Sequence, residues 1–174
     1  NSFRLNRFRL NFLWDIKMGG DIFNGTHRFL TGAGKSPLTA DRFTPRVVKG
    51  VLKDGRENTN PTPNTIVVVP ALNDAYYTNM PEEDFIEKNV NWLRLRDLTF
   101  AYAFPKNPFK DLSGIKTLEV FLTVNDLVLI TNYTGADPAV SGNTAGSRGV
   151  GGFGFDYGTM PAPISINFGL KTSF

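Results

Sequence analysis

Long stretches in which every second residue is apolar are the feature that most restricts the fold of this chain. Residues 8–18 form one such stretch, with Leu13 as its exception. In residues 164–174 the apolar side chains are Ile164, Ile166, Phe168, Leu170 and Phe174. Successive side chains of an extended strand point to opposite faces, so each stretch predicts a strand with one apolar and one polar face.

Two further stretches alternate in the same way, at residues 118–124 and 98–104. Upstream of the latter, Leu93 and Leu95 fall on the opposite parity from Leu98, which predicts a β-bulge near Arg96 and Asp97. We therefore expect an all-β chain with about four long antiparallel strands. Their expected ranges are residues 6–18, 92–104, 115–130 and 163–174.

The lengths of the strands and of their connections favour a membrane barrel over a soluble sandwich. Strands of soluble proteins usually have about 5 to 6 residues, whereas a tilted strand that crosses a bilayer needs about 9 to 11. Residues 105–114 form a short turn, while residues 19–91 and 131–162 are long and rich in Gly, Pro, Asn and Thr. Short turns on one side and long loops on the other are typical of outer-membrane barrels. If the chain ends in the periplasm at Phe174, residues 105–114 are a periplasmic turn and both long loops lie on the extracellular side.

Composition excludes several kinds of chemistry. The chain has no cysteine and one histidine, His27, so neither a disulfide framework nor a common zinc motif is expected. A net charge of +3 among 174 residues does not indicate a nucleic-acid-binding surface. We expect no enzyme activity, no catalytic residue, no cofactor and no metal.

Four strands are too few to close a barrel, because the smallest natural barrels use about 8. The chain also begins at Asn1 without a Met or an export signal. We therefore expect it to be the C-terminal segment of a larger barrel protein.

Five stretches in order along the chain form a further pattern: residues 15–24, 92–102 with 104–105, 124–127, 131–138 and 156–161. Through these stretches the chain resembles the C-terminal end of the SusC-like (RagA-like) TonB-dependent outer-membrane transporters of Bacteroidetes, in which they occur in the same order. Two departures are Asn125-Asp126-Leu127, where the family usually has Asn-Leu, and Ala139, where an acidic residue commonly stands.

The resemblance implies the architecture and partners of the complete protein. These would be a 22-stranded barrel in the bacterial outer membrane, a plug domain that this chain lacks, and a SusD-like lipoprotein lid. Such transporters import oligosaccharides or peptides with energy delivered through TonB. The alternatives that remain are a passive porin or adhesin barrel and a soluble β-sandwich lectin.

Aromatic side chains of the expected external loops are the candidates for contact with substrate or lid, because a ring beside a polar group suits such surfaces. They could instead pack the loops against one another. The aromatic candidates are Tyr76, Tyr77, Tyr133, Phe153, Phe155 and Tyr157, and the acidic Asp156 beside them is a further candidate. A separate set of residues is expected to form the signal for barrel assembly, and it consists of Phe168, Leu170 and Phe174. Residues expected at the aromatic girdle or lipid face are Trp14, Trp92, Tyr102 and Phe104.

Several local patterns predict loop or turn structure rather than a site. The glycines 149, 151 and 154 spell a dinucleotide-type motif without the required strand and helix, and Gly34-Lys35-Ser36 is expected to be a turn. Asp137-Pro138 predicts a rigid turn in which the carboxylate bonds nearby backbone. The acidic run 82–84 after Pro81 predicts a solvated first helical turn.

Overall fold

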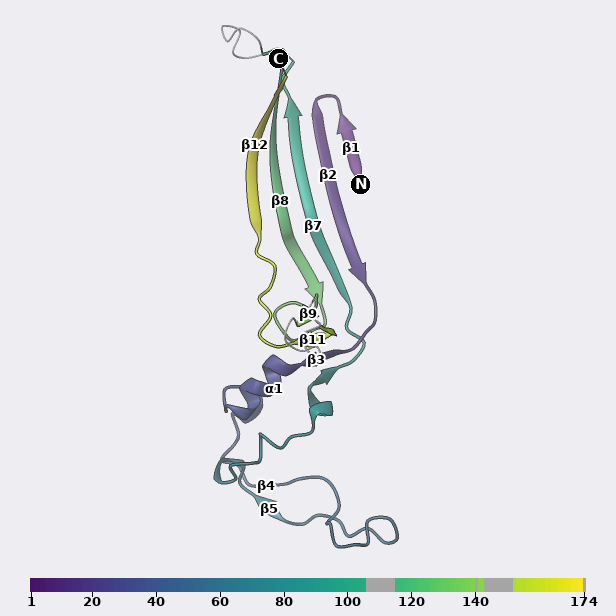
Figure 1. The fold of residues 1–174 in the computed structure, drawn as a ribbon, viewed down its shortest axis with the longest axis vertical. Helices are drawn as coiled ribbons and strands as arrows, with labels where there is room; N and C mark the ends of the chain where they lie inside the picture. Colours follow the sequence, from purple (N-terminus) through teal and green to yellow (C-terminus); the bar gives the residue numbers. More distant parts are fainter. Residues whose placement is uncertain (106–114, 140, 143–151, 174) are drawn as a thin grey trace. The chain divides into compact units, whose positions relative to one another are not determined.

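The computed structural model describes residues 1–105, 115–139, 141–142 and 152–173 (Figure 1). The chain divides into two compact units, Asn1–Ile22 with Glu87–Phe174, and Phe23–Ile86. The first unit holds the long strands, and the second holds most of the segment expected as the first external loop. Among the described residues, no helix combines the length and the apolar character that crossing a membrane requires.

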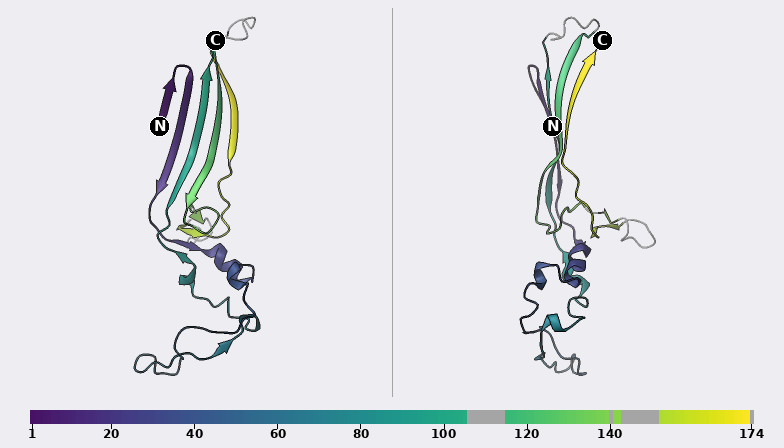
Figure 2. Two further views of the ribbon diagram at one scale, coloured as in Figure 1. Left: turned by 180° about the vertical axis from the view of Figure 1, so that it is seen from behind. Right: turned by 90° about the vertical axis from the view of Figure 1, so that its left-hand side faces the viewer.

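Five antiparallel strands make the main sheet of the first unit, in the order β1-β2-β7-β8-β12. Figures 1 and 2 show them side by side, from purple β2 through teal β7 and green β8 to yellow β12. The strands are β1 (Ser2–Leu5), β2 (Phe8–Lys17), β7 (Trp92–Ala103), β8 (Thr117–Thr131) and β12 (Ser165–Ser173). The prediction of an all-β fold with long antiparallel strands is confirmed.

Strand register aligns the apolar positions into continuous rows across the sheet. One row joins a residue of each of the five strands, and every member is exposed. Its members are Phe3, Leu10, Phe100, Leu122 and Phe168. A one-residue slip would move a strand's side chains to the other face, so the alternation seen in the sequence excludes such a slip.

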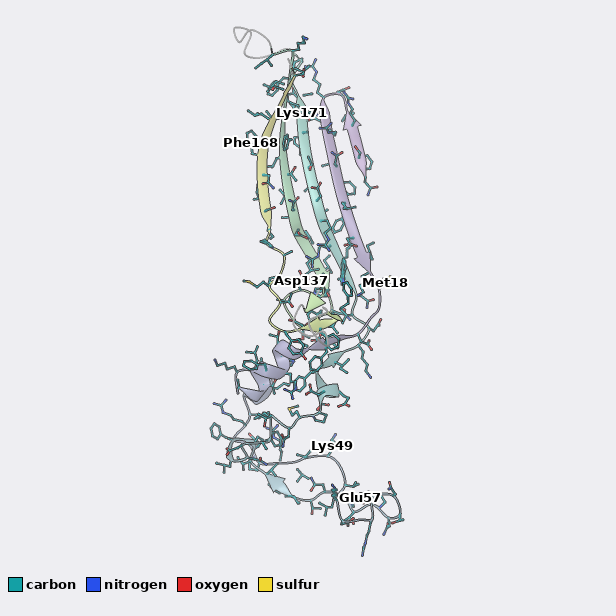
Figure 3. The ribbon with its side chains drawn as sticks, viewed as in Figure 1. Met18, Lys49, Glu57, Asp137, Phe168 and Lys171 are labelled. Atoms are coloured by element: carbon teal, nitrogen blue, oxygen red, sulfur yellow. The ribbon has the colours of Figure 1, made fainter. Side chains whose placement is uncertain are left out.

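The opposite face of the sheet carries the polar rows. Arg9 forms an ion pair with Glu119 across the strands, and the hydroxyls of Thr99 and Thr123 lie 2.9 Å apart. Figure 3 shows Phe168 and Lys171, which have opposite parity, on β12. The predicted separation of apolar and charged faces is therefore observed in the sheet.

Two irregularities of the sequence pattern have structural reasons. The register of β7 against β8 shifts between Leu95 and Asp97, which confirms the predicted bulge. Phe121, the apolar residue on the polar face, pairs with Gly169, and a Cβ built on that glycine would lie 2.2 Å from the ring. The ring of Phe121 thus fills the space left by the glycine's missing side chain.

The strand β1 was missed by the sequence analysis, which began the first strand at about residue 6. Leu5 pairs with Phe8 across a tight hairpin, and Asn6 takes a left-handed backbone angle, φ +52°. Asn is one of the few non-glycine residues that tolerate this angle. Asn6 between two alternating runs was the local signal for the hairpin.

Short helices and strands interrupt the long loop expected at residues 19–91. Asn24 caps α1 by accepting a hydrogen bond from the His27 backbone N–H at 2.8 Å, and Gly34 (φ +70°) follows the helix in a turn, as predicted. The acidic run forms a 3-10 turn after Pro81, which confirms the predicted helical turn. The elements are β3 (Ile22–Asn24), α1 (Gly25–Gly32), η1 (Pro37–Thr39), β4 (Arg46–Val47), β5 (Val67–Val68), η2 (Pro70–Leu72), η3 (Glu82–Phe85) and β6 (Ile86–Glu87).

The expected second loop, residues 131–162, also contains short strands among its described residues. These are β9 (Ser141–Gly142), β10 (Gly152–Phe153) and β11 (Phe155–Asp156), and β9 pairs with β10. The predictions for Gly149, Gly151 and the turn at 106–114 lie outside the described residues, as does that for Phe174.

Candidate functional site

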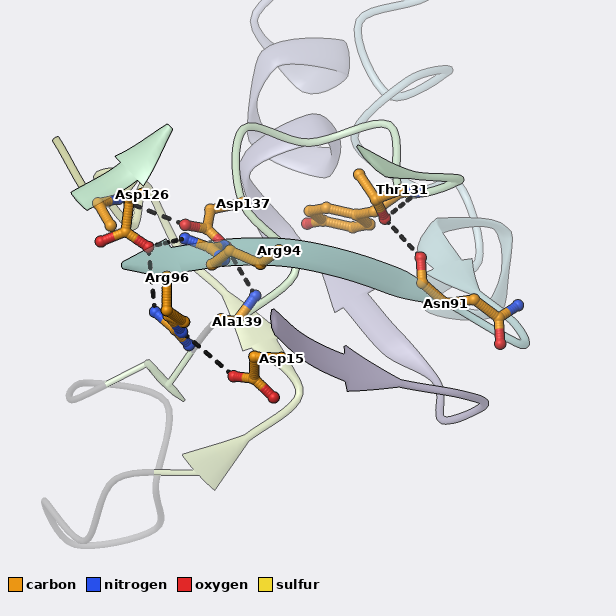
Figure 4. Close-up of polar contacts among 10 residues, drawn as sticks. Asp15, Asn91, Arg94, Arg96, Asp126, Thr131, Asp137 and Ala139 are labelled. Carbon is orange, nitrogen blue, oxygen red and sulfur yellow. Dashed lines mark hydrogen bonds and ion pairs between the residues drawn. The ribbon is translucent and has the colours of Figure 1, made fainter. Parts of the chain in front are cut away.

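A cluster of opposite charges lies where β7 and β8 meet the loop that follows β8. We call it the arginine network, and it consists of Arg94, Arg96, Asp15, Asp126 and Asp137 (Figure 4). Its members come from three strands and one loop. The bulge of β7 places both arginines on the polar face, beside Asp126, which takes a left-handed angle of φ +51°.

Arg94 is the buried centre of this network. Its side chain is 3% exposed, and its guanidinium bonds the carboxylate of Asp137 and lies 3.4 Å from that of Asp126. Because an arginine cannot lose its charge at physiological pH, burying it requires carboxylates in contact. Arg94 therefore binds the loop to the strand through Asp137.

Asp137 connects the two ends of the loop 131–162. Its carboxylate accepts hydrogen bonds from the backbone N–H of Ala139 at 2.9 Å and of Ala162 at 3.3 Å, besides its bond from Arg94. The bond to Ala139 confirms the predicted turn at Asp137-Pro138. Burial by itself would raise the pKa of Asp137, but these donors and the arginine outweigh it and lower the pKa below its ordinary value.

Arg96 occupies a more solvated position than Arg94. It lies 3.1 Å from Asp15 and 3.4 Å from Asp126, and its side chain is 35% exposed. Ion pairs at such exposure contribute little to stability. The two arginines therefore contribute differently to the stability of the network, although both lie beside Asp126.

Trp92 corrects one expectation, because it does not belong to the apolar face. Its ring is buried and lies 5.8 Å from the guanidinium carbon of Arg94 and 5.9 Å from that of Arg96. The bulge causes the difference, since it inverts the parity of β7 between Trp92 and Leu98. The girdle prediction for Trp92 is therefore wrong, whereas Trp14 and Tyr102 pair with apolar partners on the apolar face.

Tyr133 and Asp156, two of the loop candidates, are brought together by the fold. Both are buried, and the tyrosine hydroxyl donates a 2.7 Å hydrogen bond to the carboxylate. Burial, reinforced by this bond, raises the pKa of Tyr133. The ring packs with Ile22 and Val90 and covers Gly135. In this position the pair stabilises the loop and presents little surface to a ligand.

The remaining loop candidates lie at the surface. Phe153 is 90% exposed, and Phe155 and Tyr157 are also exposed, so contact with a substrate or lid stays a prediction for them. Tyr76 and Tyr77 belong to the second unit, where their rings meet edge to face at 5.0 Å. Sequence analysis missed Arg94 and Arg96 as network residues, although charged residues inside an otherwise apolar strand were a visible signal.

Comparisons with known proteins add an independent observation. No family model matches the chain. Curated proteins similar to its whole length include the TonB-dependent receptors P3, P26 and P39 of Formosa agariphila, at 29%, 25% and 23% identity over 175, 180 and 176 residues. The chain spans about one sixth of the length of these relatives, 15–16%. These similarities support a relationship to TonB-dependent receptors, and the long antiparallel strands fit an all-β part of such a receptor's barrel.

Proposed function

We propose that the chain forms part of the wall of an outer-membrane barrel that imports its substrate actively, with energy delivered through TonB. The observation that carries this proposal is the similarity, over the whole chain, to curated TonB-dependent receptors. Transport needs no covalent change in the substrate. The role of this segment is therefore to line the lumen, to support the barrel wall and to position the loop residues that meet substrate or lid.

The two faces of the sheet support a place in a membrane wall. The exposed apolar row from Phe3 to Phe168 suits contact with lipid, while the face that carries Arg9, Glu119 and the arginine network suits a polar lumen. Outer-membrane barrels alternate lipid-facing and lumen-facing residues in this manner. We infer that the apolar face lies against the bilayer.

The finer proposal is a SusC-like transporter of oligosaccharides or peptides that works with a SusD-like surface lipoprotein. Its support is the order of the family-like motifs along residues 15–161. Residues 131–162 then lie at the extracellular mouth, where the arginine network binds the loop base to the wall. The exposed rings of Phe153, Phe155 and Tyr157 are the groups that meet substrate or lid.

Uptake by cells tests the active mechanism. Accumulation of labelled oligosaccharides and peptides would be compared in cells with the full-length protein, with TonB deleted, and with the proton gradient collapsed. We expect uptake to require both TonB and the gradient. Equal uptake without TonB would contradict the proposal and favour a passive porin.

The loop and the lid are tested in parallel. The variant Tyr157→Ala should reduce uptake or recovery of a lipoprotein with the tagged transporter, at an unchanged surface level. If both are unchanged, the exposed aromatics of the loop have only a packing role.

A further inference from the structure

A cavity of about 450 Å³ lies within the second unit, and none of its lining residues belongs to the arginine network. Cavities of this size are typical of small-molecule sites, which range over about 300 to 1,000 Å³. Its lining includes Asn73, Tyr76, Asn79, Met80, Pro81 and Asp84. It is therefore large enough for one unit of a larger ligand.

The backbone of the cavity is held by its own hydrogen bonds. The side chain of Asn73 accepts a bond from the Ala75 N–H at 3.2 Å, and its carbonyl accepts one from the Tyr76 N–H at 3.0 Å. On the other wall, the Asp84 N–H donates to the Pro81 carbonyl at 3.2 Å in η3. These hydrogen bonds fix the two turns that flank the cavity.

The polar groups that line the cavity are available to a ligand. Within the described part of the chain, the structure gives no protein partner to the side-chain nitrogen of Asn73, the side-chain amide of Asn79 or the Asp84 carboxylate. The two amide nitrogens donate hydrogen bonds, and the carboxylate accepts them. A ligand that satisfies all three must both accept and donate.

An apolar surface faces the same space. The half-buried Tyr76 ring is supported edge to face by Tyr77, and Met80 and Pro81 add aliphatic surface. A flat ring beside hydrogen-bonding groups suits a ligand with one C–H face and polar edges. Sugar rings have this combination.

Charge narrows the ligand class further. Asp84 is the charged residue among the described residues that line the cavity, which disfavours uronic acids and sulfated sugars. A lysine or arginine side chain would match the carboxylate but would leave the amide donors unsatisfied. A neutral polyhydroxylated ring satisfies both.

We propose that this cavity binds a neutral saccharide unit, with Tyr76 as the stacking surface and Asn73, Asn79 and Asp84 as hydrogen-bonding groups. The inference rests on the proposed function for the origin of the saccharide, and it chooses the oligosaccharide over the peptide for this site. A terminal sugar or a short stretch of a chain occupies the cavity.

The experiment is binding of the detergent-purified full-length protein to an array that carries neutral oligosaccharides, anionic oligosaccharides and lysine-rich peptides. We expect neutral oligosaccharides to bind. Asp84→Asn should weaken this binding about tenfold, because hydrogen bonds to a charged group are among the stronger ones, and Tyr76→Ala should weaken it similarly. The matched control is Glu83→Gln, which removes a neighbouring exposed carboxylate outside the cavity lining and should leave binding within about twofold.

Several results would overturn the inference. These results are no binding of any neutral oligosaccharide on the array, preferential binding of anionic sugars or peptides, or equal effects of Asp84→Asn and Glu83→Gln. Array binding needs neither TonB nor a proton gradient, so it is separable from transport. Cavity-dependent binding with TonB-independent uptake would refute the proposed function alone, while TonB-dependent uptake with normal array binding by Tyr76→Ala would refute the cavity alone.

Discussion

Replacing Arg94 with methionine tests whether the arginine network holds the loop to the barrel wall. The change removes a guanidinium whose side chain is 3% exposed and leaves Asp137, at 7% exposure, with the N–H groups of Ala139 and Ala162 as its remaining donors. Breaking a buried ion pair by removing one partner costs about 3 to 5 kcal/mol. The opening equilibrium of the loop base should therefore rise roughly a hundredfold to several thousandfold, up to full opening.

Hydrogen–deuterium exchange measures this opening at the two amides that the carboxylate holds. In Arg94→Met, exchange of the Ala139 and Ala162 amides should accelerate by that factor until the loop is fully open. The matched control is Arg96→Met, whose side chain is 35% exposed and whose ion pairs should contribute only about 0 to 1 kcal/mol. Exchange in the control should rise no more than roughly fivefold.

A double variant separates the charge effect from a general loss of packing. Arg94→Met combined with Asp137→Asn removes both buried charges, and exchange should return toward the wild-type rate because no carboxylate is left unpaired. Equal acceleration by Arg94→Met and Arg96→Met would refute the reasoning. So would a double variant that opens more readily than Arg94→Met alone.

Three further predictions concern pH, packing and the membrane face. Because the pKa of Asp137 lies below its ordinary value, its stabilisation of the loop base is present above about pH 4 and is lost on further acidification. Exchange protection of the loop-base amides should therefore be constant from pH 8 to about pH 5 and fall below about pH 4. A loss of protection near pH 6 would point to another group. Gly169→Ala should destabilise the sheet by about 1 to 3 kcal/mol in urea unfolding, since its Cβ would collide with the Phe121 ring, and a second change of that ring to Ala should relieve the cost. Phe168→Arg should cost about 2 to 4 kcal/mol if it lies near the bilayer midplane and reduce heat-resistant barrel, whereas Asn167→Arg, on the opposite face, should be tolerated; equal loss would exclude the assigned faces.

Features that depend on neighbours in the chain could be predicted from the sequence. The strands and their two faces follow from alternation, the bulge from the parity change between Leu95 and Leu98, and the turn at Asp137 from the chemistry of Asp and Pro. The hairpin at Asn6 was also encoded locally, because the apolar residues change parity there, from Phe3 and Leu5 to Phe8 and Leu10.

Contacts between distant residues were decided by the tertiary structure. Arg94 and Asp137 are 43 residues apart, and Tyr133 and Asp156 are 23 apart, so no local pattern pairs them. Periodicity assigns a residue to a face but not to a partner, because a partner depends on strand register and on the path of the loop.

The sequence by itself determined that this chain forms long two-faced strands, because the period of two is a local property of side chains along an extended backbone. The tertiary structure decided which polar residues become buried anchors. Arg94 illustrates the difference, since its place in the strand makes it a polar-face residue, while its burial against Asp137 depends on a loop residue 43 positions away. Burial and charge pairing are properties of the assembled sheet and loop, and they arise only when segments distant in the chain are brought together.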